Sequence, residues 1–257
     1  DVQQAAWAVI KRGDNALVIA PTGSGKTLAA FLQAIASLFH ERALEAAGLS
    51  PAQKRRMETR VLYISPLKAL GADVRKNLDV PLRGVSSARE RRGDPAASIT
   101  VGMRTGDTPS SERAGLIRRP PDILITTPES LYLMLTSKAR ETLRHVRTVI
   151  VDEVHAVAGT KRGAHLALSL ERLDNLLESP AQRVGLSATV RPVDQVAAFL
   201  GGTRPVTVVN PPSSRRLEMR IVVPVEDIPV LPAPAGGVQG ASAPQGRPGP
   251  NHFHHHA

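Results

Sequence analysis

The chain has 257 residues, 42% of them hydrophobic, and carries 33 Lys and Arg against 23 Asp and Glu, a formal net charge of +10. The charge favours a phosphate-rich partner, although a solvated basic surface explains it equally well. The absence of cysteine excludes disulfides, thiolate nucleophiles and cysteine-based metal sites, and no apolar run approaches the ~20 residues of a transmembrane helix. We therefore expect a soluble, cytoplasmic protein with no membrane partner.

Seven short apolar runs predict the strands of a sheet. They are residues 16–20, 61–65, 99–103, 123–126, 148–151, 184–187 and 206–209. Most of their residues are β-branched or Leu and do not alternate strictly with polar ones, which is typical of parallel strands covered on both faces. Apolar stripes with helical spacing, as from Leu28 to Phe39 and from Leu166 to Leu177, lie between the runs. The pattern predicts an open, mainly parallel α/β sheet with helices on both faces.

Other stretches lack the pattern of a packed core. Residues 43–59 and 83–97 are predicted to be loops or insertions. In residues 233–257, 9 of 25 residues are Pro or Gly, and large apolar side chains are too few to offset chain entropy. The sequence thus predicts a main domain over 1–205, a connector or the start of a next domain over 206–232, and a disordered tail over 233–257. Together they are expected to be a fragment of a longer protein.

A glycine-rich segment joins the first predicted strand to the first predicted helix. It reads Ala20-Pro21-Thr22-Gly23-Ser24-Gly25-Lys26-Thr27. In this context, backbone N–H groups and Lys26 can hold the β- and γ-phosphates of ATP, and the Thr27 hydroxyl can bind Mg²⁺. The strict pattern of such a loop begins with Gly where this chain has Ala20, and an ordinary glycine-rich turn is the alternative.

Two acidic residues, Asp152 and Glu153, end the fifth predicted strand. Such residues point into the ligand crevice of an open α/β sheet. We expect Asp152 to hold Mg²⁺ through water and Glu153 to orient and deprotonate the attacking water, whereas a capping acidic pair is the alternative. The hydroxyls of Ser187 and Thr189, after the sixth predicted strand, are expected to hydrogen-bond His155 and report the nucleotide state.

Polar clusters also follow the second, third and fourth predicted strands. They are Ser65-Pro66-Leu67-Lys68, Arg104-Thr105-Gly106-Asp107-Thr108 and Thr126-Thr127-Pro128-Glu129. Each offers hydroxyls, N–H groups and a helix start, which can hold a sugar–phosphate backbone without reading bases. Ordinary helix capping is the alternative, with Thr127 as the N-cap and Pro128 after it. The low aromatic content of 3% argues against a base-stacking surface.

The segments APTGSGKT, SPLKAL, RTGDT, TTPESL, DEVH and SAT, in this order, resemble the motifs of superfamily 2 helicases of the DEAD/DEAH type. The longer SPLKALGADVRKNL and TTPESLYLML resemble the large helicase-related (Lhr) family. The resemblance covers about Gln3 to Gly202 and implies a RecA-like first motor domain, which binds ATP against a second RecA-like domain. It implies these roles: adenine sensing by Gln3; nucleotide binding and hydrolysis by Lys26, Thr27, Asp152 and Glu153; coupling by Ser187 and Thr189; and strand contacts by Ser65, Pro66, Lys68, Arg104, Thr105, Thr127 and Pro128.

The same resemblance implies 3′-to-5′ movement on single-stranded DNA, unwinding of duplexes or RNA–DNA hybrids, and a role in DNA repair. Because no motif of a second motor domain follows Gly202, the chain alone is expected to hydrolyse little ATP. Two alternatives stay open: a P-loop ATPase or kinase that does not act on nucleic acid, and a nucleic-acid adaptor with a decayed ATPase site. The three polar clusters argue against the first, and the intact Lys26, Thr27, Asp152 and Glu153 argue against the second.

Overall fold

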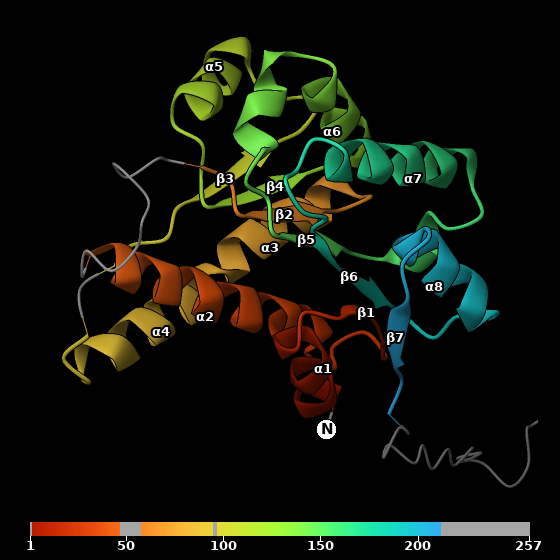
Figure 1. Ribbon diagram of the computed structural model, residues 1–257, viewed down its shortest axis with the longest axis horizontal. Helices are drawn as coiled ribbons and strands as arrows, with labels where there is room; N and C mark the ends of the chain where they lie inside the picture. The colour runs from red at the N-terminus through yellow and green to blue at the C-terminus, as the bar shows by residue number, and fades with distance from the viewer. Residues whose placement is uncertain (1, 47–57, 95–96, 212–257) are drawn as a thin grey trace, which may run out of the picture. The chain divides into compact units, whose positions relative to one another are not determined.

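The computed structural model of the chain describes residues 2–46, 58–94 and 97–211. Its centre is a seven-stranded sheet in the order β3-β4-β2-β5-β6-β1-β7, and every neighbouring pair is parallel (Figure 1). The strands are β1 (Asn15–Ile19), β2 (Val61–Ile64), β3 (Val101–Arg104), β4 (Ile123–Thr126), β5 (Thr148–Val151), β6 (Gln182–Ser187) and β7 (Val206–Val209). The predicted parallel sheet is confirmed. The predicted tail at 233–257 lies outside the described residues.

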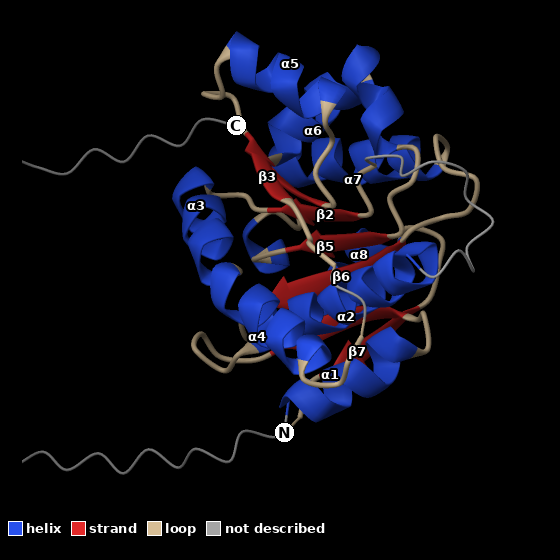
Figure 2. Cartoon of the chain, turned by 90° about the vertical axis from the view of Figure 1, so that its left-hand side faces the viewer, coloured by secondary structure: helices blue, strands red, loops and turns tan. Residues whose placement is uncertain are grey.

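Helices cover both faces of the sheet (Figure 2). One face carries α1 (Val2–Lys11), α2 (Lys26–Ala46), α3 (Lys68–Asn77) and α4 (Asp79–Glu90). The opposite face carries α6 (Pro128–Leu135), the 3-10 turn η1 (Lys138–Leu143), α7 (Lys161–Asp174) and α8 (Val193–Gly201). Helix α5 (Ser110–Arg118) joins β3 to β4, and the short turn η2 (Val154–Ala156) follows β5.

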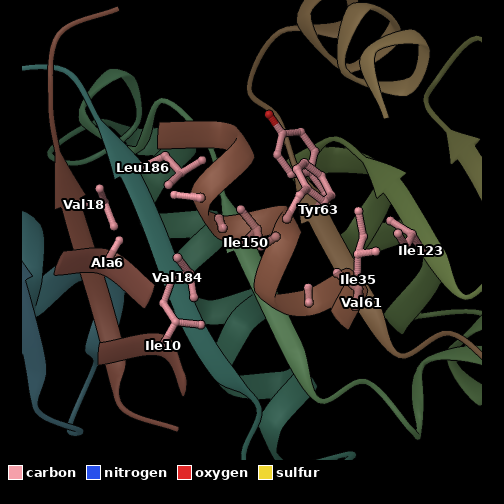
Figure 3. Packing of buried hydrophobic residues seen from close by; sticks show 14 of the residues in the cluster. Ala6, Ile10, Val18, Ile35, Val61, Tyr63, Ile123, Ile150, Val184 and Leu186 are labelled. Atoms are coloured by element: carbon pink, nitrogen blue, oxygen red, sulfur yellow. The ribbon is translucent and has the colours of Figure 1, made fainter. Parts of the chain in front are cut away.

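Alternate side chains of each central strand enter opposite core clusters, because successive residues of a strand point to opposite faces. In β2, Val61 and Tyr63 pack under α1 to α4, whereas Leu62 and Ile64 pack under α6 to α8. Figure 3 shows the first of these clusters, with Tyr63 near Ile35 of α2. Since both faces are buried, the strands need apolar residues at every position, which explains the uninterrupted apolar runs in the sequence.

The two predicted loops are partly helical, so this part of the prediction was wrong. Helix α2 extends to Ala46, and α4 occupies most of the basic stretch 83–97. Leu78, Leu82 and Val85 pack against the first core cluster at the spacing of one helical face. The exposed Arg83 and Gly84 between Leu82 and Val85 concealed this spacing. Residues 47–57, the rest of the other predicted loop, lie outside the described part of the chain.

Three further boundaries differ from the sequence prediction. Strand β3 starts two residues later than predicted and includes Arg104, and α7 ends at Asp174, before Leu176 and Leu177. Strand β7 pairs with β1, so the sheet continues past the boundary predicted at residue 205. None of the described helices is long and apolar enough to cross a membrane.

Candidate functional site

The carboxyl ends of all seven strands meet at one edge of the sheet, because the strands are parallel. The strand order divides this edge into two halves. The ends of β1, β6 and β5 bring the glycine-rich loop, Ser187 and Asp152 together, and the ends of β2, β4 and β3 bring the three polar clusters together. Sequence segments more than 100 residues apart therefore form one continuous edge, with β2 and β5 at the boundary between its halves.

The glycine-rich loop, residues 20–25, has the geometry of a phosphate cradle. Gly23 and Gly25 both have φ of 79°, in the left-handed region that favours glycine. A Cβ atom on Gly25 would collide with the side-chain amide of Gln3. The hydroxyl of Ser24 is buried and is one of three such side-chain atoms in the described residues that lack a hydrogen-bond partner. An orphaned hydroxyl beside a helix N-terminus fits an anionic ligand that satisfies it.

Lys26 and Thr27 begin α2, directly after the loop. Lys26 is 5% exposed, so its stem is buried beside the loop and its charge is confined there. Thr27 is partly buried, and Thr22 is exposed at the start of the loop. The loop is fastened to the sheet because the N–H of Ala20 donates to the carbonyl oxygen of Ser187 at 3.1 Å. Ala20, which stands at the first position of the loop, is therefore compatible with a loop that lies between the ends of β1 and β6.

Gln3 lies on α1, which is fixed against the helix that follows the loop. The indole Nε1 of Trp7 donates to the carbonyl oxygen of Ala29 in α2 at 2.9 Å. Gln3 is one helical turn before Trp7, and its amide lies next to Gly25. The structure therefore brings Gln3 to the loop, and its contact with adenine stays a prediction.

The Asp152 carboxylate is held by a donor on each oxygen. Asp152 is 2% exposed; its Oδ1 accepts from the backbone N–H of Glu153 at 2.8 Å, and its Oδ2 accepts from the Tyr63 hydroxyl. Burial, and then the charge of Asp152, raise the pKa of Tyr63 above its usual value, so the phenol keeps its proton and donates it. The carboxylate is thus oriented before any ligand arrives.

Glu153 has φ of 44° and ψ of 42°, and among the described residues it is the only non-glycine residue with positive φ. This left-handed backbone costs on the order of 1–3 kcal/mol and is typical of functional sites. The Glu153 side chain is 24% exposed, so water reaches its carboxylate. Its accessibility distinguishes it from the buried Asp152 and suits the predicted role as the base.

His155 links the β5 end to the β6 end, but not through the groups that the sequence predicts. The backbone N–H of Ala188 donates to His155 Nδ1 at 3.3 Å, whereas the Ser187 hydroxyl donates to the carbonyl oxygen of Ala188 at 2.8 Å. Thr189 is exposed. Because Nδ1 of the neutral imidazole accepts this bond, it has no proton to donate to Glu153 Oε2, which lies 3.4 Å away. The predicted hydroxyl bonds from Ser187 and Thr189 are therefore wrong for this conformation, and the connection runs through the backbone.

The donor set at this half of the edge fits Mg²⁺ shared with a nucleotide. A hydroxyl (Thr27) and a carboxylate (Asp152) are the oxygen donors that Mg²⁺ prefers, and Mg²⁺ commonly completes its shell with phosphate oxygens and water. No group of three or more His, Asp or Glu side chains in the described ranges forms a self-contained metal centre. Thr27 and Asp152 therefore fit an Mg²⁺ ion that binds together with the nucleotide.

The predicted strand-contacting residues are mostly buried. Ser65, Pro66, Arg104, Thr105, Thr127 and Pro128 all fall in the buried class. Their hydroxyls build turns: Ser65 donates to the carbonyl oxygen of Leu67 at 2.9 Å, and Thr127 caps α6 by accepting from the N–H of Ser130 at 3.4 Å. The Thr105 hydroxyl accepts from the N–H of Asp107 at 3.3 Å. In this conformation these hydroxyls close turns and cap a helix, as the capping alternative expects, and contact of these residues with a nucleic-acid strand stays a prediction.

Lys68 is the exception, since it begins α3 and its side chain is 55% exposed. Its Nζ lies 2.6 Å from Oδ2 of Asp107, in the turn after β3. Arg113 of α5 holds that turn by donating to the carbonyl oxygens of Gly106 and Thr108, each at 2.7 Å. Burial, and then the nearby charge of Arg113, lower the pKa of Arg104 from its usual value. Two arginines and one lysine therefore meet at the end of β3.

Two residues of this edge, Arg113 and Tyr63, were missed by sequence reasoning, and Asp107 was named only as a member of the cluster after the third strand. Asp107 and Arg113 act through contacts with the β3 turn that no local pattern indicates. Tyr63 did leave a signal, because it is the one aromatic residue in the second apolar run and a buried phenol needs a hydrogen-bond partner.

Comparison with known proteins identifies relatives of this chain. Residues 1–196 match the family described as DEAD/DEAH box helicase. The chain is 62% identical over 248 residues to the Lhr helicase/uracil glycosylase of Escherichia coli K12, covering 96% of this chain and 16% of that protein. It is 43% identical over 233 residues to the ATP-dependent helicase Lhr-Core protein 2 of Thermococcus barophilus, covering 88% and 26%.

A solved structure gives the same result for the fold. The structure of Mycobacterium smegmatis helicase Lhr bound to ssDNA and AMP-PNP matches with a TM-score of 0.74 and 62% identity, covering 82% of this chain and 25% of that one. This match confirms the predicted RecA-like fold. The chain spans only 16% to 26% of the length of these relatives.

Proposed function

Because the chain belongs to the DEAD/DEAH box helicase family, we propose that it is a motor domain of an ATP-dependent helicase that moves on single-stranded DNA. The observation that carries the proposal is the single sheet edge that holds the phosphate cradle, the Asp152–Glu153 pair and the Lys68 turn. The relative of known structure from Mycobacterium smegmatis, which has 62% identity, was solved with ssDNA and AMP-PNP.

In the proposed mechanism, the loop N–H groups and Lys26 hold the β- and γ-phosphates of ATP. Glu153 orients the attacking water and accepts its proton, because its carboxylate is partly open to solvent. Thr27 and Asp152 would hold Mg²⁺, which neutralises negative charge on the transferred phosphoryl group when bound. His155 and Ala188 transmit the state of Glu153 to the β6 end through the Ala188 N–H bond.

We extend the proposal to a longer protein in which a second RecA-like domain closes the ATP cleft and supplies an arginine finger. Movement from 3′ to 5′, action on RNA–DNA hybrids and a role in DNA repair are parts of this proposal that follow from the resemblance to Lhr helicases. The name of the Escherichia coli relative combines a helicase with a uracil glycosylase, which supports the repair assignment.

Single-stranded DNA is proposed to bind along the ends of β2, β4 and β3 through its phosphates. Lys68 is the exposed cation at the start of α3, and its ion pair with Asp107 is open to solvent on both sides. Exposed pairs of this kind contribute little to stability, so a phosphate can replace Asp107 as the partner of Lys68. The α3 N-terminus adds N–H groups that favour the same anion.

We predict that Lys68→Ala lowers single-strand affinity for all sequences alike, whereas Asp107→Asn raises it, because the amide releases Lys68 to the phosphate. Each neutralised phosphate contributes roughly 0.7 to the slope of log affinity against log salt for single strands, so Lys68→Ala should reduce the slope by about that amount. Fluorescence anisotropy with an oligothymidine across a salt series measures both quantities.

Arg91→Ala and Arg92→Ala provide the control, because both residues are exposed and basic but follow the C-terminal end of α4. They should leave the salt slope nearly unchanged. If these two variants lower affinity and slope while Lys68→Ala does neither, the strand binds elsewhere. If no variant and no salt concentration reveals single-strand binding, a P-loop ATPase or kinase unrelated to nucleic acid becomes the better assignment.

A further inference from the structure

Tyr63 belongs to β2, on the strand-contacting half of the edge, yet its hydroxyl reaches the nucleotide half. Strands β2 and β5 are paired so that Tyr63 lies opposite Ile150 and Ile64 opposite Val151, one residue before Asp152. The phenol therefore crosses the boundary between the halves and donates to Oδ2 of Asp152. Since Oδ1 accepts from the Glu153 N–H at 2.8 Å, each carboxylate oxygen has one fixed donor.

The Tyr63 ring is itself immobilised. It is fully buried in the first core cluster and stacks on Phe31 with ring centroids 5.0 Å apart and planes inclined by 29°. Phe31 belongs to α2, five residues after Lys26. Figure 3 shows the Tyr63 hydroxyl pointing away from Ile35 and Val61, toward the margin of the cluster. The phenol is thus fixed relative to the helix that carries Lys26 and Thr27.

We infer that Tyr63 is a positioning residue for the divalent cation of this site: its hydroxyl locks the Asp152 carboxylate in the orientation that receives Mg²⁺ with the nucleotide. The inference rests on the proposed function. Without the phenol, Oδ2 of the nearly inaccessible Asp152 loses its donor and the carboxylate is free to rotate about its Cβ–Cγ bond. The lone pairs of the Asp152 oxygens that accept from neither donor then no longer point in one fixed direction. Cation binding must therefore also restrict the rotation of the carboxylate.

The test compares nucleotide affinity with and without the cation. Groups that orient a metal ligand change metal affinity by about 10- to 100-fold when they are removed. Tyr63→Phe should therefore raise the MgCl₂ concentration that half-saturates binding of a fluorescent ATP analogue by about tenfold. Affinity measured in EDTA should stay the same, because the phenyl ring keeps its stack on Phe31. Tyr132→Phe is the matched control, since Tyr132 is the other tyrosine of the chain and packs on His165, 4.6 Å between ring centroids, in the α6–α7 pair.

Two outcomes would overturn the inference. One is an unchanged MgCl₂ requirement in Tyr63→Phe; the other is an equal loss of affinity in MgCl₂ and in EDTA, which would mean that the phenol only supports packing. Asp152→Asn separates this failure from failure of the proposed function. If Asp152→Asn shifts the MgCl₂ requirement and Tyr63→Phe does not, the site stands without Tyr63; if neither shifts it, the Mg²⁺ assignment itself is wrong.

A measurement on the unsubstituted chain covers the case in which Tyr63→Phe does not fold. Incorporated 3-fluorotyrosine gives two fluorine resonances, one for each tyrosine, and Tyr132→Phe assigns them. With the ATP analogue present, MgCl₂ should shift the Tyr63 resonance and leave that of Tyr132 in place. A Tyr63 resonance that does not respond to MgCl₂ contradicts the inference.

Discussion

Glu153→Gln should abolish ATP turnover while leaving Mg-ATP affinity within about twofold. The amide keeps the shape of the side chain but cannot accept a proton from water, and general-base catalysis of this kind contributes roughly 10²- to 10⁴-fold to the rate. The substitution also keeps the Glu153 N–H that orients Asp152. Steady-state ATPase rates should be measured in a protein that joins this chain to its proposed second motor domain, with single-stranded DNA present, and compared with equilibrium binding of an ATP analogue.

Glu112→Gln is the control for the charge change, because Glu112 is exposed in the first turn of α5. Its turnover should equal that of the unsubstituted protein. If Glu153→Gln retains full turnover, another group activates the water, and the left-handed backbone at Glu153 needs a different explanation. A parallel loss of nucleotide binding would instead assign Glu153 to the ground-state site.

Lys26→Ala should lower Mg-ATP affinity by about 10- to 100-fold, because a charged hydrogen-bond partner of a phosphate contributes about 1.5–3 kcal/mol. Lys26 is nearly inaccessible and follows two glycines that hold the loop open. No other cation in the described residues begins a helix directly after such a loop. Isothermal titration calorimetry on the 257-residue chain measures the change, and ATP should no longer raise the unfolding temperature of the variant.

Lys161→Ala matches this substitution in residue type and helix position, since Lys161 is exposed at the first position of α7. It should bind Mg-ATP as tightly as the unsubstituted chain. Equal affinity in Lys26→Ala and Lys161→Ala would place the nucleotide elsewhere, and the glycine-rich loop would then be a turn with no ligand.

Several features of this protein are determined by short segments, so the sequence alone is enough to predict them. Each strand is a run of four to six residues, and the seven predicted runs coincide with β1 to β7 within two residues at each end. The apolar character of β1, β2, β4 and β5 depends on burial of both their faces. The left-handed glycines of the loop that we propose as a phosphate cradle are likewise a property of consecutive residues between a strand and a helix. The order of these segments was also sufficient for the resemblance to helicases, which the comparisons support.

Contacts between distant segments were decided by the tertiary structure. The sequence does not specify that β2 lies beside β5, and it therefore does not indicate that Tyr63 meets Asp152, 89 residues later. The same holds for Lys68 and Asp107, which are 39 residues apart. A polar side chain at a strand end has the same local sequence whether it faces solvent or closes a turn. Only packing of the neighbouring elements decided that Ser65, Thr105 and Thr127 close turns here, because burial leaves their hydroxyls no partner but the backbone and side chains beside them.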